Sequence, residues 1–267
     1  MVNKTDFQAV IWQKGNELYR PMPWRENTDP YYVLVSELML QQTQVERVMP
    51  KFLAFIERFP TVTDLAASSL GDVLVMWSGL GYNRRAKYLH SAACRIVANH
   101  GGNMPLTYDE LMQLPGVGPN TAGAIMAYAF NQPIVFIETN IRSVYFHHYF
   151  HDDDQVNDKE IRHLLETTLD REHPREWYWA LMDYGSELKK QGLGRIRQSS
   201  HYKKQSTLNG SMREMRGRII RALTVSERSE EQLRKDVLAD DRFERALADL
   251  LDESLVEQTA ERIHLTK

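Results

Sequence analysis

The feature that most constrains this chain is a glycine-containing turn between two helical patterns, at residues 114–118. The turn reads Leu-Pro-Gly-Val-Gly, and a second helical pattern follows it from Asn120. Glycine lets the backbone turn tightly, and amide N–H groups left unpaired at the positive end of a helix dipole suit a phosphate group. A lone Gly-x-Gly more often marks an ordinary helix connection, so its neighbours decide how it is interpreted.

A candidate catalytic carboxylate follows this turn by about twenty residues. Glu138 and Asn140 come directly after the apolar run at residues 134–137. The single segment 114–140 therefore carries both a candidate phosphate-binding turn and a candidate catalytic group.

Composition limits the cofactors and the location that we expect. The 267 residues are enough for two domains, and 42 % of them are hydrophobic. The single cysteine, Cys94, excludes an internal disulfide and a four-cysteine metal or iron–sulfur site, and we expect it to pack in a helix. Because no long apolar run and no signal-peptide pattern occur, we expect a cytoplasmic protein without a membrane segment.

The distribution of charge is more informative than the net charge of −3. Basic residues cluster at 84–87 and again from Lys189 to Arg221. A solvated helix face is the alternative for any such run, but Gly192 and Gly194 indicate that part of the second cluster is a loop. Both clusters are candidates for contact with nucleic acid.

Helical patterns account for the first 190 residues, where no convincing set of strands occurs. Asp29 and Pro30 are expected to begin a helix that runs through residues 31–52. Within it, Glu37 is either a surface residue or a buried acid whose raised pKa suits a general acid. The polar run Gln41–Gln44 suits hydrogen bonds to DNA bases, or is a plain polar helix end.

The last 57 residues follow a different pattern. Helices are predicted near residues 212–224, 229–239 and 241–253, followed by two short strands around a turn. This order suggests a winged helix-turn-helix. Such domains often bind DNA, and many serve instead as protein-packing modules.

Six strings carry a resemblance to a known family. They are SELMLQQTQV, FPTVTDLA, WSGLGYNRRAKYLH, LPGVGPNTAGAI, ETNIRSV and ALMDYG. Their identity and order resemble the helix-hairpin-helix (HhH-GPD) DNA glycosylase superfamily, and most closely its adenine-specific, MutY-like branch. Several long motifs in the expected order are far more specific than a lone Gly-x-Gly.

The resemblance implies an all-α fold of two helical domains with a small C-terminal winged-helix-like domain. A monomer would bind double-stranded DNA across the cleft between the two domains and flip the target base into it. The domains would be residues 28–135 with six helices and the hairpin, residues 1–27 together with 136–190, a basic loop at 191–210, and the winged-helix-like domain at 211–267.

The resemblance also implies roles for three catalytic residues. Glu37 matches the general acid that protonates the departing base. Glu138 stands where the family has an aspartate that stabilises the positively charged sugar, and Asn140 matches a residue that supports this centre. A carboxylate beside an oxocarbenium-like sugar lowers the barrier electrostatically, and a poor leaving group needs a proton.

The remaining matched positions are those expected to contact DNA. They are Trp24 and Arg25 in the wall of the base pocket, Gln41 and Gln42 probing the opened stack, Tyr82 intercalating, Gly116 and Gly118 in the phosphate-binding hairpin, which a monovalent cation often completes, and Asn120 in the second hairpin helix.

Four departures from the family pattern change what we expect. Glu138 adds a methylene to the usual aspartate, a change that bears on the activity rather than on the fold. Asn120 replaces the nucleophilic lysine of bifunctional relatives, so no lyase activity is expected. The four cluster cysteines are absent, so we expect no iron–sulfur cluster, and the basic residues from Lys189 to Lys204 are hypothesised to contact the DNA backbone instead. The usual domain that recognises 8-oxoguanine is replaced by the shorter tail.

The sequence therefore favours a monofunctional DNA glycosylase of base excision repair, acting first on adenine opposite 8-oxoguanine or guanine. One alternative is a uracil or thymine mismatch glycosylase. An alternative of another class is a catalytically silent protein that binds damaged DNA, against which the presence of Glu37, Tyr82 and Asn140 argues. An α-helical protein-interaction domain is the least favoured reading.

Overall fold

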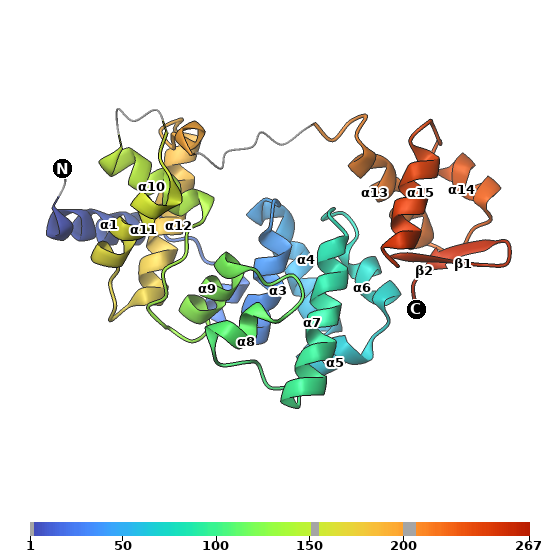
Figure 1. The fold of residues 1–267 in the computed structure, drawn as a ribbon, viewed down its shortest axis with the longest axis horizontal. Helices are drawn as coiled ribbons and strands as arrows, with labels where there is room; N and C mark the ends of the chain where they lie inside the picture. Colours follow the sequence, from blue (N-terminus) through green and yellow to red (C-terminus); the bar gives the residue numbers. More distant parts are fainter. Residues whose placement is uncertain (1–2, 151–154, 200–206) are drawn as a thin grey trace. The chain divides into compact units, whose positions relative to one another are not determined.

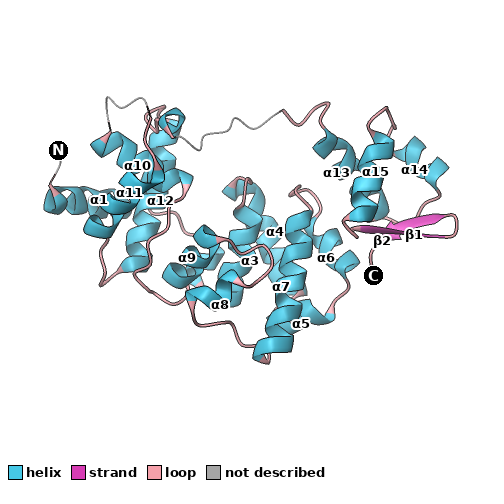
Figure 2. Ribbon diagram, in the orientation of Figure 1, coloured by secondary structure: helices cyan, strands magenta, loops and turns pink. Residues whose placement is uncertain are grey.

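The computed structural model describes residues 3–150, 155–199 and 207–267, and most of these residues are helical (Figures 1 and 2). The all-α fold class predicted from the sequence is confirmed, with one pair of strands near the C-terminus. No helix in the described ranges has the length and apolarity needed to cross a membrane.

The elements are α1 (Lys4–Leu18), α2 (Pro23–Glu26), α3 (Pro30–Leu40), α4 (Val45–Arg58), α5 (Val62–Ala67), α6 (Leu70–Trp77), α7 (Arg84–His100), α8 (Tyr108–Met112), α9 (Pro119–Tyr128), α10 (Thr139–Tyr149), α11 (Asp158–Thr168), α12 (Pro174–Lys190), a 3₁₀ turn (Ile196–Gln198), α13 (Met212–Leu223), α14 (Glu230–Asp236), α15 (Phe243–Asp252), β1 (Val256–Thr259) and β2 (Arg262–Leu265).

The chain divides into two compact units, each built from segments that are distant in sequence. Unit 1 comprises Met1–Val33, Leu106–Met112 and Val117–Lys204. Unit 2 comprises Leu34–Pro105, Gln113–Gly116 and Gln205–Lys267. The chain crosses between the units several times, within α3 and again around the hairpin turn.

The core of unit 1 is an aromatic cluster shared by α1, α10 and α12. Phe7 of α1 is fully buried, and its ring centre lies 5.2 Å from that of Tyr145 and 6.2 Å from that of Trp177. Close contact of α1 with α12 depends on Gly15, where an added Cβ would lie 2.5 Å from Cβ of Ala180. Large aromatic rings thus fill the space among the helices, and a small pair lets two of them approach.

A buried ion pair fastens the segment after α1 to α12. The Asp183 carboxylate, 2 % exposed, accepts hydrogen bonds from Arg25 Nη1 at 2.7 Å and from Arg20 Nε at 2.6 Å. Arg25 also donates to the carbonyl of Arg20 at 3.0 Å. With both oxygens and most donors satisfied, the buried charges are compensated, and the loop before α2 is held at one position.

Helices α10 and α12 approach so closely that one position on α12 must be glycine. A Cβ added at Gly185 would lie 2.1 Å from the carbonyl oxygen of Asn140. The atoms opposed to it are backbone, so no side-chain rotation relieves the overlap. Gly185 therefore sets how near the first turn of α10 lies to α12.

The prediction of one long helix over residues 31–52 is wrong, because the structure has two helices there. Helix α3 ends at Leu40, and α4 begins at Val45. Between them Gln42 has a φ of +56°, which a continuous helix does not permit. The predicted start was right, since Asp29 accepts a hydrogen bond from the amide of Tyr31 at 2.8 Å.

The C-terminal segment of unit 2 has the predicted order of three helices and a strand pair. Ser229 caps α14 as a capping box with Gln232. Strands β1 and β2 are antiparallel, with Val256 opposite Leu265. Burial of the inward sides of α13, α14 and α15 gives this segment its own small core, formed by Ile219, Leu233, Phe243, Leu250 and Ile263.

Gly185→Ala should lower the free energy of unfolding by about 1–3 kcal/mol, because the new methyl group forces α10 away from α12. Urea denaturation measures this change. The matched control is Gly217→Ala on α13, where nothing lies within 4 Å of the added Cβ. That substitution should stabilise the protein by about 0.5–1 kcal/mol through helix propensity alone. Equal effects of the two substitutions would contradict the close approach.

Candidate active site and nucleic-acid interface

Glu138, the candidate carboxylate, stands at the N-terminus of α10 in an extended backbone conformation. It is half-buried, and burial raises the pKa of its carboxyl to about 7, while the charge of Arg142 acts in the opposite direction. Arg142 is itself held by Asp158, with Nε and Nη2 at 2.9 and 2.6 Å from the two carboxylate oxygens. A carboxyl group with this pKa changes charge near neutral pH, as a group acting in catalysis often does.

Asn120 fixes the chain directly before Glu138. Its side-chain amide donates to the carbonyl of Ile137 at 2.9 Å and accepts from the amide of Ile137 at 3.3 Å. The Asn120 carboxamide thus pairs with both backbone groups of Ile137, as a neighbouring strand would in a sheet. The structure thus brings together the second hairpin helix and the candidate carboxylate, which are seventeen or more residues apart in the sequence.

Asn140 lies in the first turn of α10, two residues after Glu138. Its Oδ1 accepts a hydrogen bond from Nζ of Lys189 at 3.0 Å, and Gly185 lies against its backbone. Helix α12 therefore fixes both the side chain and the main chain of this residue. The predicted supporting role of Asn140 remains a prediction, with a defined set of contacts around it.

The hairpin consists of α8, a turn and α9, and its two glycines differ in why glycine is required. Gly116 has a φ of +77°, and a Cβ there would lie 2.7 Å from Cβ of Tyr88. Gly118 has an ordinary extended conformation as N-cap of α9, with nothing within 4 Å of an added Cβ. Packing explains Gly116, whereas Gly118 leaves an open approach to the N-terminus of α9, the feature expected at a phosphate contact.

Glu37 is half-buried on α3, between the buried residues Ser36 and Leu38. Its exposure therefore lies between the two alternatives considered from the sequence, a surface residue and a buried acid. Glu37 belongs to unit 2 and Glu138 to unit 1.

Two predicted DNA-probing turns of unit 2 are joined by one buried side chain, Arg85. From the first turn of α7, its Nη1 donates to the carbonyls of Leu38, Met39 and Gln41 at 2.8, 2.7 and 2.7 Å. Its Nη2 donates to Thr43 Oγ1 at 3.1 Å and to the carbonyl of Gly81 at 3.0 Å. The guanidinium therefore binds the end of α3, the turn that carries Gln41 and Gln42, and the turn before Tyr82.

The electrostatics of Arg85 are those of a structural cation that interacts with neutral groups. The side chain is 6 % exposed, and burial lowers the pKa of its guanidinium to about 10. The guanidinium carbon lies 5.3 Å from the ring centre of Trp77 and 5.5 Å from that of Tyr82. Carbonyl dipoles and aromatic faces thus surround the charge, which remains protonated at neutral pH.

Trp24 and Arg25, predicted in the wall of the base pocket, are both buried in unit 1. Arg25 is held by the ion pair with Asp183, and its guanidinium carbon lies 5.4 Å from the ring centres of Tyr19 and Trp179. These contacts give Arg25 an anchoring role within unit 1. Its predicted part in a base pocket stays a prediction.

The basic clusters are only partly available to solvent. In the first, Arg85 is buried, while Arg84 and Lys87 bind Glu253 of the C-terminal segment. In the second, Lys189 binds Asn140, and Lys203 and Lys204 lie outside the described residues. No group of three or more His, Cys, Asp or Glu side chains placed to hold a metal ion occurs in the described ranges.

Sequence reasoning missed three residues that position the candidate site: Arg85, Arg142 and Asp183. Two of them had a visible signal, since Asp183 is an acid among the apolar residues of α12 and Arg142 follows Glu138 by one helical turn. Arg85 had none, because neighbouring basic residues hide it.

Arg85→Lys should lower the free energy of unfolding by about 2–4 kcal/mol, because one ammonium group cannot satisfy all the carbonyls that the guanidinium binds. The control is Arg84→Lys at the neighbouring position, whose side chain is 61 % exposed. That change should cost less than about 1 kcal/mol. Urea denaturation compares the two, and similar losses for both would contradict the structural role of Arg85.

Residues 35–170 match the family described as HhH-GPD superfamily base excision DNA repair protein. The adenine DNA glycosylase of Buchnera aphidicola subsp. Baizongia pistaciae is 37 % identical over 171 residues, which cover 62 % of this chain and 48 % of that protein. The adenine DNA glycosylase of Mycobacterium tuberculosis is 40 % identical over 141 residues, covering 52 % of this chain and 46 % of that protein.

Among solved structures, a thermostable thymine-DNA glycosylase is similar with a TM-score of 0.63 and 26 % identity, covering 68 % of this chain and 86 % of that one. The chain spans about half the length of the curated relatives it matches. The family match extends over half of the chain and includes Glu37, the hairpin and the segment from Asn120 to Arg142. The chain belongs to the HhH-GPD superfamily of base excision DNA repair proteins.

Proposed function

We propose that this protein is a monofunctional DNA glycosylase that hydrolyses the N-glycosidic bond of a base flipped from double-stranded DNA. Adenine opposite 8-oxoguanine or guanine is the first substrate, in keeping with the adenine DNA glycosylases that the chain resembles. The observation that carries the proposal is Glu138, a half-buried carboxyl whose pKa of about 7 is set by burial, directly after a backbone fixed by Asn120.

The proposed reaction assigns one step to each of two acids. Glu37 donates a proton to a ring nitrogen of the departing base, and the bond between that base and C1′ breaks with its electrons on the base. The carboxylate of Glu138 stabilises the positive charge left on the sugar. Water then adds to C1′ and passes a proton to the Glu37 carboxylate, which restores the acid and leaves an abasic site and the free base.

Because Glu138 stands in place of an aspartate, the reaction rate depends on where its longer side chain puts the carboxylate. The extra methylene moves the carboxylate by roughly 1.5 Å along its stem, a displacement that can cost about a hundredfold in rate if nothing compensates. Asn120 and Arg142 supply two restraints on this part of the chain, through Ile137 and through the charge near Glu138. We propose that these restraints hold a productive carboxylate.

Asn120 also supports hydrolysis without lyase activity. Lyase chemistry of related enzymes needs an amine nucleophile that forms a Schiff base with the sugar. The carboxamide of Asn120 has no such lone pair, and both of its polar atoms bind Ile137.

The residues present do not fit the iron–sulfur cluster of the family. Such a cluster needs four thiolates, and the only cysteine of this sequence is Cys94, half-buried on α7 with its Sγ 3.7 Å from the carbonyl of Ala66. We therefore propose an enzyme that works without a cluster. A monovalent cation at the hairpin backbone, a monomeric state and action on DNA in the cytoplasm or nucleoid are further parts of this proposal.

A second candidate substrate is thymine or uracil opposite guanine. The similarity to a thymine-DNA glycosylase, at 26 % identity over most of that protein, favours it. The same two acids would serve, because the sugar cation forms whichever base departs.

Single-turnover base release on a panel of duplexes tests the proposal. The panel contains adenine opposite 8-oxoguanine, adenine opposite guanine, and uracil or thymine opposite guanine. We expect release of adenine, and a loss of at least about a thousandfold in Glu37→Gln or Glu138→Gln, because each removes a group that acts in the transition state. Glu138→Asp serves as a matched variant that keeps the carboxylate.

The possible results separate the alternatives. Release of uracil or thymine alone would replace the first substrate by the second. Tight, salt-sensitive duplex binding without any release would favour a silent DNA-binding protein. Recovery of release in Glu138→Asp from an inactive wild type would show that the longer side chain abolished the chemistry.

The pH dependence of base release tests the role of Glu138. Because the ionised carboxylate of Glu138 is the active form and its pKa is raised to about 7, the rate should rise with pH through about 7, until loss of the proton from the acid Glu37 ends the rise. Arg142→Gln removes a charge that lowers this pKa, so the rise should move to higher pH. Arg171→Gln, an exposed arginine of unit 1, should leave the profile unchanged. An unshifted profile in Arg142→Gln would contradict the assignment.

A further inference from the structure

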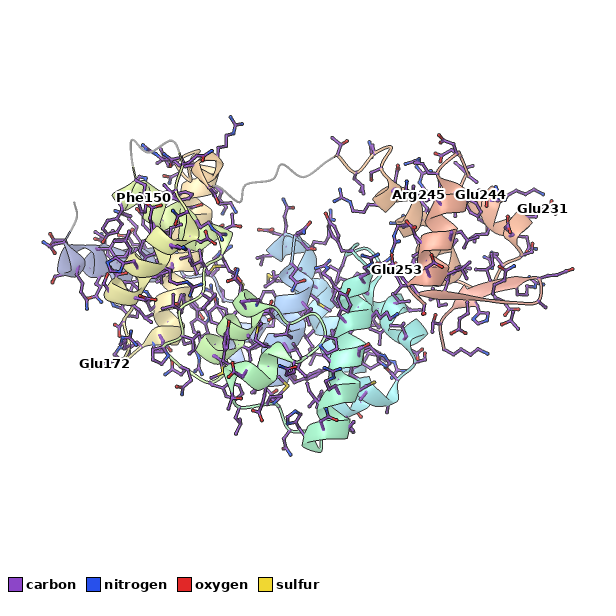
Figure 3. The ribbon with its side chains drawn as sticks, in the orientation of Figure 1. Phe150, Glu172, Glu231, Glu244, Arg245 and Glu253 are labelled. Atoms are coloured by element: carbon purple, nitrogen blue, oxygen red, sulfur yellow. The ribbon has the colours of Figure 1, made fainter. Side chains whose placement is uncertain are left out.

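The C-terminal module, defined as residues 211–267, docks on α6 and α7 within unit 2. Its main anchor is Glu253, which follows α15 and is labelled in Figure 3. The Glu253 carboxylate accepts hydrogen bonds from Arg84 Nη2 at 2.6 Å and from Arg216 Nη1 at 2.7 Å. Lys87 donates a hydrogen bond to the backbone carbonyl of the same residue. The residue after β2 also packs against α6, since a Cβ added at Gly71 would lie 3.0 Å from the carbonyl oxygen of Thr266.

The charges at this anchor compensate one another. Burial alone would raise the pKa of Glu253, but hydrogen bonds from Arg216 and Arg84 outweigh it and hold that pKa below its usual value. The pair of Glu253 with Arg216 is largely shielded from solvent, since their side chains are 12 % and 18 % exposed, whereas Arg84 adds an exposed contact from α7.

The docked module places one of its arginines on Tyr82. Arg213, in the first turn of α13, donates from Nη1 to the Tyr82 hydroxyl. Its guanidinium carbon also lies 5.0 Å from the centre of the Tyr82 ring. The start of α13 is in turn fixed to α15, because Arg242 Nη1 donates to the carbonyl of Ser211 at 2.9 Å.

Tyr82 needs external support because its backbone is strained. Its φ of +50° lies in the left-handed region, which a non-glycine residue adopts at a cost of about 1 kcal/mol or more. The turn before it contains Gly79 and Gly81 at φ values of +95° and +72°. Arg85 and Arg213 both lie against its ring, one from the interior and one from the module.

The module is poorly suited to read DNA through its third helix. In helix-turn-helix proteins this helix enters the major groove. Here the solvent-exposed residues of α15 are Glu244, Arg245, Ala248 and Asp252, which carry two negative charges and one positive charge. Figure 3 labels Glu244 and Arg245 on this helix. An acidic exposed face is repelled by phosphates, so a packing role is favoured.

We propose that Arg213 is a positioning residue for Tyr82, and that the C-terminal module acts in DNA opening by holding this side chain ready to enter the duplex. The inference rests on the proposed function and on the expectation, from the family resemblance, that Tyr82 intercalates. It assigns the module an intramolecular partner, the turn at residues 79–82, and no base-reading role. The hydroxyl of Tyr82 is the atom through which Arg213 acts.

A double-mutant cycle of Arg213→Gln and Tyr82→Phe tests the proposal in the full-length protein. Two quantities are measured: affinity for a duplex with an uncleavable abasic-site analogue, and the opening rate reported by 2-aminopurine beside the target base. Each single variant should lose about tenfold or more, the size expected for one charge-assisted hydrogen bond. The double variant should be no worse than either single variant by more than about twofold, because both remove the same interaction.

Two further variants separate positioning from general charge. Arg213→Lys keeps the positive charge without the planar fork, so it should recover less than half of the loss in opening rate. Arg245→Gln removes an exposed arginine from the same module and should match the wild type in both measurements. Thermal unfolding midpoints of all variants establish that each is folded.

The outcomes distinguish this inference from the proposed function. Losses that multiply in the double variant, or full recovery in Arg213→Lys, would identify a direct phosphate contact and overturn positioning. Faster opening in Arg213→Gln would identify Arg213 as a restraint, which also overturns the proposal. A wild type that binds and opens duplexes without releasing a base would overturn the proposed function alone, and the cycle would still be decided by binding and opening. A wild type that binds no duplex would overturn both.

Discussion

The arrangement of unit 2 depends on one buried guanidinium. Arg85 donates to carbonyls at the end of α3 and in two separate turns, and each of those turns carries side chains expected to enter DNA. A carbonyl that loses its donor in the interior costs more than the original hydrogen bond contributed, so these turns are fixed together or lost together. The break in the helix at Gln42 follows from the same residue, because Arg85 satisfies the carbonyls that a continuing helix would have used.

Around Glu138 the restraints have a different character. Asn120 acts on the main chain, Arg142 on the charge, and Lys189 on the neighbouring Asn140. Under the proposed function none of these groups needs to touch the substrate, because each fixes the position or the protonation of a group assigned to the reaction. The glycine at 185 belongs to this set, since it lets α12 approach the backbone of Asn140.

The sequence predicted what is decided locally and missed what is decided by distant partners. The cap Asp29, the hairpin turn and the order of the C-terminal elements all depend on neighbouring residues, and they were predicted correctly. The break at residues 41–44 is held by an arginine more than forty positions away, and the polar run Gln41–Gln44 was the one local sign of a helix end. The place of Arg25 in a pocket wall stays a prediction, and the sequence did not indicate the partner that buries it, Asp183, which lies 158 residues further on.

The basic residues at 84–87 show why a charge run does not by itself define a DNA-binding surface. Arg85 stabilises the interior, and Arg84 and Lys87 bind the C-terminal module through Glu253. Cations used in this way release few counterions on DNA binding and contribute little to its salt dependence. Under the proposed function they would act on DNA through geometry, because the module that they anchor carries the arginine that contacts Tyr82. The cations at residues 84–87, which the sequence offers as candidates for DNA contact, therefore hold parts of unit 2 together.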